Sequence, residues 1–248
     1  MSGHSKWATI KHKKGAADKA RGKLFAKLAR QIEVAAKGGG DVDTNPSLRT
    51  AVQKAKAARM TNEAIDRAVK RGTGDSDGGT YESIMYEGYA PGGVALMIDV
   101  LTDNRNRTGS DIRNIFTKLG GSMAEPGAVS WQFERRGVIL TGSGVEEDVI
   151  MMTALEAGAD DIIAESGAFR VMTDPSVVYD VRVTLDGAGI EVISADSPMV
   201  SENLVPITDA SEAKAVLRIL EALEDNDDVQ DVFSNFDISD ELMEVAAS

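Results

Sequence analysis

The side chains near the start of the chain that are best suited to chemistry are closely spaced cations. Seven Lys and Arg side chains lie within the first 23 residues, interleaved with His4, Trp7 and His12: Lys6, Lys11, Lys13, Lys14, Lys19, Arg21 and Lys23. Cations at this density neutralise phosphates and release counterions, and an indole can stack on an unpaired base. The pattern indicates a nucleic-acid-binding segment. For Trp7, packing into a helical bundle is the alternative.

A second polar cluster lies between an expected strand and an expected helix, and consists of Asp103, Asn104, Arg105, Asn106 and Arg107. Functional loops often occupy such a position, so we interpret it as a candidate interaction loop. The alternative is structural: Asn or Asp caps the helix and the arginines pair with acidic neighbours. As a catalytic site the cluster is weak, because no activated nucleophile or histidine accompanies it. We therefore expect a protein that is not an enzyme.

Other site chemistries find little support in the residue types. Two histidines and no cysteine argue against a transition-metal site. The glycine clusters at 38–40, 72–79, 91–93 and 120–121 match neither a phosphate loop nor a dinucleotide fingerprint, so we read them as turns and linkers. The carboxylates between 224 and 231 lack the spacing of a calcium loop and are interpreted as a solvated acidic face. No metal and no cofactor are expected.

The charge of the chain is divided between its two ends. Residues 1–74 hold 17 Lys and Arg against 6 Asp and Glu, a net charge of +11, whereas residues 75–248 carry −24. A local field of this size favours phosphate as a partner of the N-terminal part, although the whole chain carries −13. The alternative is that the basic part docks on the acidic remainder of the same chain.

The composition also indicates in which cellular compartment the protein works. The start of the chain is polar, no stretch is apolar enough to span a membrane, and the absence of cysteine fits a reducing environment. We expect a cytoplasmic protein with no membrane partner.

Three short helices are expected to position the N-terminal cations. From Asp18 to Lys37 one apolar stripe repeats with helical spacing, formed by Phe25, Leu28, Ala29, Ile32 and Ala35. Nearly opposite it, within an arc of roughly 80°, lies a cationic ridge of Lys19, Lys23, Lys27, Arg30 and Lys37. Asn45 and Pro46 should begin a second helix, and Thr61 a third that Gly72 closes.

The remainder reads as α+β. Strands are expected at 81–89 and 94–101, then a helix carrying Ile112, Ile115, Phe116 and Leu119, and a strand at 129–133. Residues 137–195 alternate as βαββαβ, the ferredoxin-like order, with helices marked by Val145, Val149, Met152 and Leu155 and by Val178, Val181 and Leu185. A tail helix capped at Asp209 and a strand at 229–233 should complete the region that precedes this insertion.

These expectations give three domains: a basic helical domain over 1–74, an α+β domain formed by 80–135 plus 203–240, and an inserted ferredoxin-like domain over 136–202.

Several long motifs, in order, resemble the YebC family, whose mitochondrial relatives are translational activators of cytochrome oxidase. They are Gly3-His4-Ser5-Lys6-Trp7, Arg21-Gly22-Lys23-Leu24-Phe25, Asn45-Pro46-Ser47-Leu48-Arg49, the run from Tyr86 to Gly93, Thr102-Asp103-Asn104-Arg105-Asn106-Arg107, Glu156-Ala157-Gly158-Ala159-Asp160 and the run from Leu223 to Val229. The resemblance implies the same three-domain fold and no enzymatic activity.

The resemblance also narrows the function without deciding it. It implies a DNA-binding transcriptional regulator or, alternatively, a ribosome-associated factor that binds ribosomal RNA and meets the ribosome or tRNA, aiding translation through stretches such as consecutive prolines. Because no helix carries several base-reading side chains at set spacing, contacts to the phosphate backbone are expected to dominate. The expected nucleic-acid-binding residues are Lys6, Trp7, Lys11, Lys13, Lys14, Lys19, Arg21, Lys23, Lys27, Arg30 and Arg49.

Overall fold

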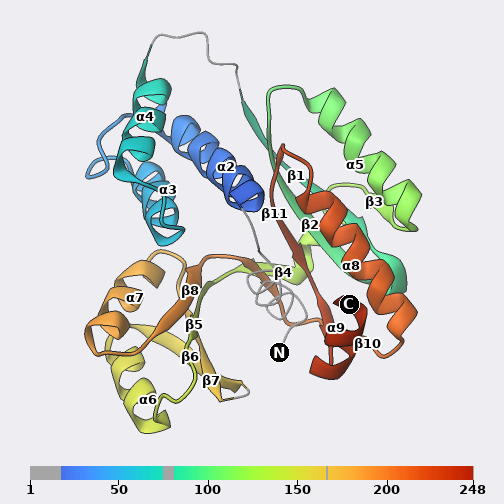
Figure 1. Cartoon of the computed structure of the whole chain (residues 1–248). Helices are drawn as coiled ribbons and strands as arrows, with labels where there is room; N and C mark the ends of the chain where they lie inside the picture. The colour runs from blue at the N-terminus through green and yellow to red at the C-terminus, as the bar shows by residue number, and fades with distance from the viewer. Residues whose placement is uncertain (1–17, 75–80, 166, 248) are drawn as a thin grey trace. The chain divides into compact units, whose positions relative to one another are not determined.

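The computed structural model describes residues 18–74, 81–165 and 167–247 (Figure 1). The fold is the expected α+β arrangement: a three-helix bundle, then an α+β domain interrupted by a ferredoxin-like insertion. Contacts divide the chain into two compact units, Glu134–Val200 and Met1–Phe133 with Ser201–Ser248. The finer division into three domains, with the boundaries given above, stays a prediction. No helix in the described residues is long and apolar enough to cross a membrane.

The bundle consists of α2 (Asp18–Ala36), α3 (Pro46–Ala57) and α4 (Asn62–Thr73). Its core is small and aliphatic, built from Leu28, Ile32, Leu48, Val52, Ala55, Ile65 and Ala68. The caps lie where the sequence indicates. The side-chain oxygen of Asn45 accepts the Leu48 N–H at 3.1 Å, and that of Thr61 accepts the Ala64 N–H at 3.4 Å. Each cap pairs a backbone donor that would otherwise be unpaired at a helix start.

The sequence suggested that Gly72 ends α4, but the helix continues to Thr73. Glycine is required there because α4 packs directly on α2. A Cβ at position 72 would lie 2.7 Å from the Cβ of Ala36 and would also collide with the carbonyl oxygen of Glu33. The residue therefore sets the close approach of two helices rather than a helix end.

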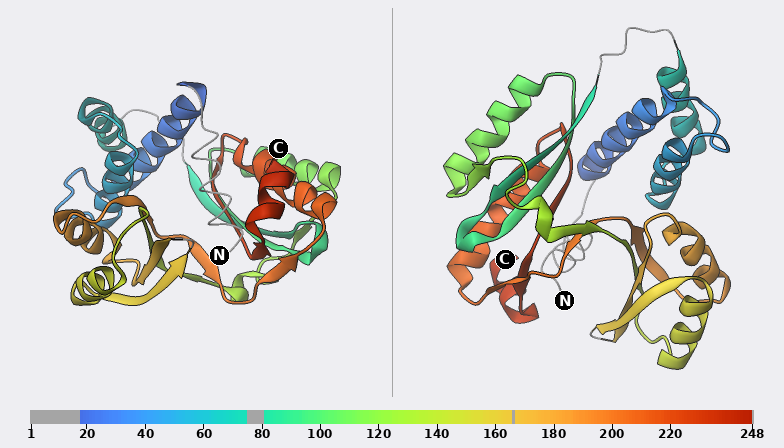
Figure 2. Two further views of the ribbon diagram at one scale, coloured as in Figure 1. Left: turned by 60° about the horizontal axis from the view of Figure 1, so that its bottom comes forward. Right: turned by 180° about the vertical axis from the view of Figure 1, so that it is seen from behind.

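The α+β domain is a four-stranded sheet in the order β11-β2-β1-β3. Its strands are β1 (Glu82–Tyr89), β2 (Ala95–Thr102), β3 (Ser122–Ala124) and β11 (Val229–Ser234). As expected, the C-terminal tail completes the sheet, because β11 pairs with β2 in antiparallel register, Val232 opposite Ile98. Helices α5 (Arg105–Leu119) and α8 (Ala210–Glu224) lie side by side over one face (Figures 1 and 2). Buried residues of all these elements form one core.

Several short elements were not foreseen. Residues 129–133 are not a strand: Ser130–Gln132 form the 3₁₀ turn η2, followed by β4 (Phe133–Arg135), which pairs with β9 (Met199–Ser201). The turn expected at 91–93 is present as the 3₁₀ turn η1 (Pro91–Gly93), which joins β1 to β2. In the tail, β10 (Val205–Ile207) and β12 (Phe236–Ile238) form a parallel pair, and α9 (Asp240–Ala247) follows.

The inserted unit has the expected ferredoxin-like order. Its elements are β5 (Gly137–Thr141), α6 (Glu147–Glu156), β6 (Ala159–Glu165), β7 (Ala168–Thr173), α7 (Val178–Gly187) and β8 (Val192–Asp196). The sheet order is β6-β7-β5-β8, so the first and third strands of the motif lie in the centre. Val178, Val181 and Leu185 of α7 are buried, as the spacing predicted.

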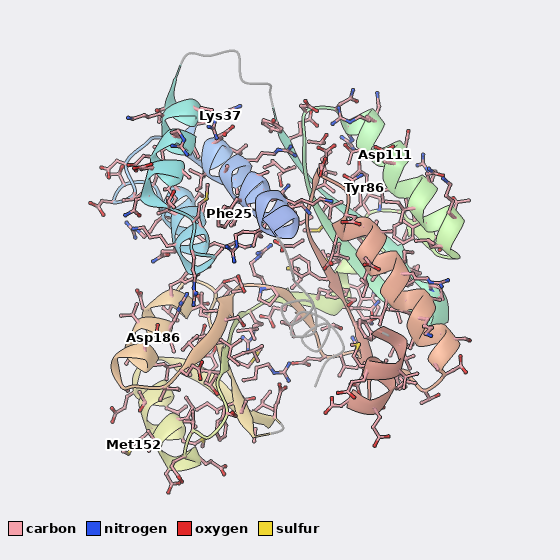
Figure 3. All side chains as sticks on the ribbon, viewed as in Figure 1. Phe25, Lys37, Tyr86, Asp111, Met152 and Asp186 are labelled. Carbon is pink, nitrogen blue, oxygen red and sulfur yellow. The ribbon has the colours of Figure 1, made fainter. Side chains whose placement is uncertain are left out.

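The face of α6 that the sequence singled out is largely the wrong one. Ile150 and Ala154 are buried, whereas Val149, Met152 and Leu155 are 45%, 68% and 50% exposed. Figure 3 shows Met152 on the side of α6 that points away from its sheet. The helix is apolar almost all round, so periodicity cannot choose the buried face.

Candidate nucleic-acid interface

Three residues of the cationic ridge, Lys23, Lys27 and Arg30 of α2, lie against an acidic segment of the same chain, Glu224–Asp231, which runs from the end of α8 into β11. Lys23 Nζ lies 3.1 Å from Asp225 Oδ1 and 3.7 Å from Asp227 Oδ1, and it also donates to the Asp225 carbonyl oxygen. Lys27 Nζ donates to the Glu224 carbonyl oxygen at 2.8 Å. Two lysines of the ridge are therefore engaged by this segment.

Arg30, the next residue of the ridge, is held more extensively. Its Nη1 donates to the Asp227 carbonyl oxygen at 3.1 Å, to Asp228 Oδ1 at 3.2 Å and to the Leu101 carbonyl oxygen at 3.3 Å. The guanidinium carbon lies 5.2 Å from the centre of the Tyr81 ring, within the range of a cation–π contact. These contacts fix the guanidinium from several directions.

The bundle adds contacts beside the ridge. Lys54 Nζ of α3 lies 3.0 Å from Asp231 Oδ2, and the side chain of Gln31 donates to that of Gln230 at 3.2 Å. The segment Glu224–Asp231 is thus only in part the solvated acidic face that its composition suggested, because Asp225 and Asp227 stay largely exposed while Asp228 is buried. Part of the basic region docks on acidic residues of its own chain, which is the alternative that the charge division left open.

Asp228 is the centre of a polar network and its side chain is only 12% exposed. Oδ2 accepts from Thr108 Oγ1 at 2.6 Å, from Arg107 Nη2 at 2.8 Å and from Thr102 Oγ1 at 3.3 Å. Burial acts to raise the pKa of Asp228, but hydrogen bonds from Arg107 and Thr108 and the charges of Arg107 and Arg30 outweigh it, so the pKa is lowered. Hydrogen bonds to Asp228 and to Asp103 in turn raise the pKa of Arg107.

The Asp103–Arg107 cluster is mostly the beginning of α5 rather than a loop. Asn104 caps the helix, its Oδ1 accepting the Arg107 N–H at 3.1 Å, and Arg107 lies 2.8 Å from Asp103 Oδ1 as well as from Asp228. This is the structural alternative for three of the five residues. Arg105 and Asn106 are exposed, and the side chain of Arg105 contacts no other described residue by hydrogen bond or ion pair.

The other predicted nucleic-acid-binding residues do not form one surface in the part of the chain that the structure describes. Lys6, Trp7, Lys11, Lys13 and Lys14 lie outside the residues that the structure describes, as does the side chain of Lys19. Arg49 donates to the carbonyl oxygens of Val42 and Asp43 at 3.0 and 2.7 Å, so it shapes the loop before α3. Arg21 is exposed on α2. The structure therefore brings Lys23, Lys27 and Arg30 together, but not Arg49.

The bundle also carries cations that sequence reasoning did not select. Five exposed side chains make no hydrogen bond or ion pair with any other described residue: Arg21, Lys56, Arg59, Arg67 and Lys70. Arg67 and Lys70 lie on the side of α4 opposite its buried residues, and Arg59 lies in the turn between α3 and α4 with a φ of 62°. Because Ile65 and Ala68 face inward, helical spacing puts Arg67 and Lys70 on the outward side, and this periodicity is the signal that could have found them.

Among the described residues no group of three His, Cys, Asp or Glu side chains is arranged to hold a metal ion. The buried carboxylate of Glu87 is used structurally, since it accepts the N–H groups of Gly127, Val129 and Ser130 at 2.7, 2.7 and 3.0 Å. Burial acts to raise the pKa of Glu87, but the three backbone hydrogen bonds prevail and lower it.

Known proteins resemble this chain over its whole length. Residues 5–75 match the model of the TACO1/YebC N-terminal domain, and residues 81–236 match that of the TACO1/YebC second and third domain. A "probable transcriptional regulatory protein" of Halothermothrix orenii is 54% identical, over 98% of both chains. Another of that name, from Rubrobacter xylanophilus, is 56% identical, again over 98% of both chains.

A solved structure agrees with the fold. A conserved hypothetical protein from Aquifex aeolicus, 44% identical, superposes with a TM-score of 0.81 and covers 93% of this chain and 96% of its own. Motifs, fold and full-length similarity lead to one assignment: the chain belongs to the TACO1/YebC family.

Proposed function

We propose that the protein is a non-catalytic, nucleic-acid-binding regulator of gene expression that binds DNA and regulates transcription. The names of its relatives support a transcriptional role. The helical bundle is the part that contacts nucleic acid, because it belongs to the stretch with a net charge of +11.

The observation that carries the proposal is the set of bundle cations without an internal partner. Lys23, Arg30 and Lys54 are paired with carboxylates of the acidic segment and Lys27 donates to one of its carbonyl oxygens, whereas five cations remain exposed and unpaired within the described residues: Arg21, Lys56, Arg59, Arg67 and Lys70. Unpaired surface cations are available to phosphates, and each phosphate neutralised releases counterions. With the lysines of residues 6–14, they give the N-terminal part its affinity for a polyanion.

The mode of recognition follows from the residue types on α4. Its outward face offers Arg67 and Lys70, with Glu63 one turn before Arg67, and this short set of charges does not read base edges. Backbone contacts and groove shape therefore carry most of the affinity. With about five phosphates neutralised, the logarithm of the affinity should fall by roughly 3.5–4.5 per tenfold rise in salt.

A second candidate function, a ribosome-associated translation factor that binds RNA, is favoured by the charge of the inserted unit. Residues 134–200 hold 13 Asp and Glu, four Arg and no Lys, a net charge of −9. Such a unit is repelled by nucleic acid and suits a basic protein surface, which fits a protein that holds RNA with one part and meets proteins with another.

Crosslinking in cells, followed by sequencing of the attached nucleic acid, tests the proposal. Enrichment of promoter DNA supports the transcriptional regulator. Enrichment of ribosomal RNA or tRNA supports the translation factor and refutes the first candidate. Recovery no higher than that of a variant with Arg59, Arg67 and Lys70 changed to Glu would refute nucleic-acid binding by the bundle.

A further inference from the structure

We propose that the acidic segment, Glu224–Asp231, is an intramolecular competitor that occupies the cationic ridge until nucleic acid displaces it. The inference rests on the proposed function and deepens it, because it assigns the ridge a second occupant and makes binding conditional on opening. The phosphate backbone of a nucleic acid is the partner that the ridge and Lys54 then accept.

The chemistry offered by the segment is similar to that of a phosphate backbone. It offers Lys23 the carboxylates of Asp225 and Asp227, Lys54 that of Asp231, and Lys27 a carbonyl oxygen. Anionic and carbonyl oxygens are the acceptors that an ammonium group also finds on phosphates. A polyanion and the acidic segment therefore compete for the same side chains.

The docking is polar and can be undone. The hydrophobic cluster of the bundle and that of the α+β domain share no residue, and no hydrophobic cluster among the described residues joins the two. The side chains of Asp225 and Asp227 are 76% and 81% exposed in their contacts with Lys23. Exposed ion pairs of this kind contribute about 0–1 kcal/mol each and are screened by salt. Polar interfaces between domains permit relative motion.

Opening leaves no buried charge without a partner. If Arg30 withdraws, Asp228 keeps its hydrogen bonds from Arg107, Thr108 and Thr102, all of which belong to the α+β domain. The usual cost of breaking a buried ion pair arises from the charge left behind, and here that charge remains satisfied. The network around Asp228 thus allows the bundle to leave while the α+β domain stays intact.

The consequence is a two-state equilibrium in which nucleic acid binds the open form better. The apparent affinity is then lower than the intrinsic affinity by the fraction of open molecules. Anything that weakens the hold of the acidic segment should tighten binding of nucleic acid, and anything that fixes the closed form should weaken it.

A reversible tether tests this directly, because the chain contains no cysteine. In the full-length double variant Lys23→Cys, Asp225→Cys, the two thiols are joined by a short reducible bis-maleimide, and binding of duplex DNA and of the matching RNA is measured before joining, after joining and after reduction. The same variant with both thiols capped by a mono-maleimide controls for bulk. We expect roughly tenfold weaker binding when joined, restored by reduction.

Neutralisation is the second measurement. We compare a triple variant of the acidic segment, Asp225→Asn, Asp227→Asn, Asp231→Asn, with a control that removes three charges from exposed carboxylates elsewhere in the chain, Glu125→Gln, Glu202→Gln, Glu241→Gln. The first variant should bind the same probes several-fold more tightly than the control. Equal affinities of the two triple variants, or equal binding by the joined and unjoined forms, would overturn the competitor while leaving the proposed function standing. Absence of binding by every form, including the wild type, would overturn both.

Discussion

Arg30 of α2 and Asp228, just before β11, lie nearly two hundred residues apart in the sequence, yet their side chains meet at 3.2 Å. The same carboxylate accepts hydrogen bonds from Arg107 and Thr108 of α5. One acidic residue thus connects the bundle, the helix that follows β2 and the strand that completes the sheet. It is also the most buried carboxylate of the acidic segment.

Replacing Asp228 should destabilise the α+β domain. Asp228→Ala removes the acceptor shared by Arg107, Thr108 and Arg30, so we expect a loss of about 2–3 kcal/mol in the free energy of unfolding. Urea denaturation followed by circular dichroism measures it. Asp225→Ala, at a 76% exposed side chain, is the control and should change stability by less than about 1 kcal/mol. Equal effects of the two substitutions would contradict the role of Asp228.

Acid should weaken the fold through Glu87 and Asp228. The pKa of each is lowered in the folded protein from ordinary values of 4.5 and 3.8. A lowered folded pKa stabilises above the unfolded value, and this stabilisation is lost as the pH falls through the folded pKa. The free energy of unfolding should therefore decline as the pH drops below these ordinary values.

The variant Glu87→Gln isolates one of the two contributions. Its amide can offer only one oxygen where the carboxylate uses two to accept three N–H groups, so we expect a loss of about 1–3 kcal/mol at neutral pH. Urea titrations at pH 7 and below pH 4 should show the gap between variant and wild type narrowing in acid. A gap independent of pH would mean that Glu87 is not ionised in the folded state.

Two glycines on the bundle should respond in opposite directions. Gly72→Ala forces α2 and α4 apart, since the new Cβ would lie 2.7 Å from that of Ala36, and should cost about 1–3 kcal/mol. Gly22→Ala, within α2 and with no atom within 4 Å of its Cβ, should stabilise by about 0.5–1 kcal/mol. Thermal denaturation of the full chain measures both. A neutral Gly72→Ala would show that α2 and α4 are not in close contact.

The tail and the first α+β region should fold only together. Residues 81–133 lack β11 and α8, which contribute Val232, Leu217 and Leu220 to the core, so this fragment should be unfolded alone by circular dichroism. A chain in which a glycine–serine linker replaces 134–200 should retain cooperative unfolding, because the core of the larger unit contains no residue of that stretch. A stably folded 81–133 fragment would contradict this.

Local features of the fold could be read from the sequence, and long-range pairings could not. Asn45, Thr61 and Asp209 announce helix starts because capping depends on neighbours two or three positions away. The pairs of α2 with the acidic segment join residues about 200 positions apart, so no spacing reveals them. In the sequence Asp228 is one of several neighbouring carboxylates, and only the fold shows that it is buried while Asp225 is exposed.

The prediction of secondary structure and buried faces failed where the hydrophobic pattern was ambiguous or too short. In α6, Val149, Ile150, Met151 and Met152 follow one another, so both faces are apolar and the spacing cannot favour one. The strands β10 and β12 have three residues each, and their pairing is set by the surrounding core rather than by alternation. Of the candidate site, the ridge and the outward side of α4 follow from helical geometry, whereas its docking partner does not.

The bundle is proposed to hold nucleic acid through cations that pair with no other described residue of the chain. The most direct test compares two double variants by the salt dependence of their binding to duplex DNA and to RNA. One is Arg67→Glu, Lys70→Glu in α4, and the matched control is Arg113→Glu, Lys118→Glu at exposed cations of α5. We expect the α4 variant to lose affinity and the slope of its log affinity against log salt to shrink by roughly 2, whereas the α5 variant should stay close to wild type. Identical affinity and slope for the two variants would contradict it.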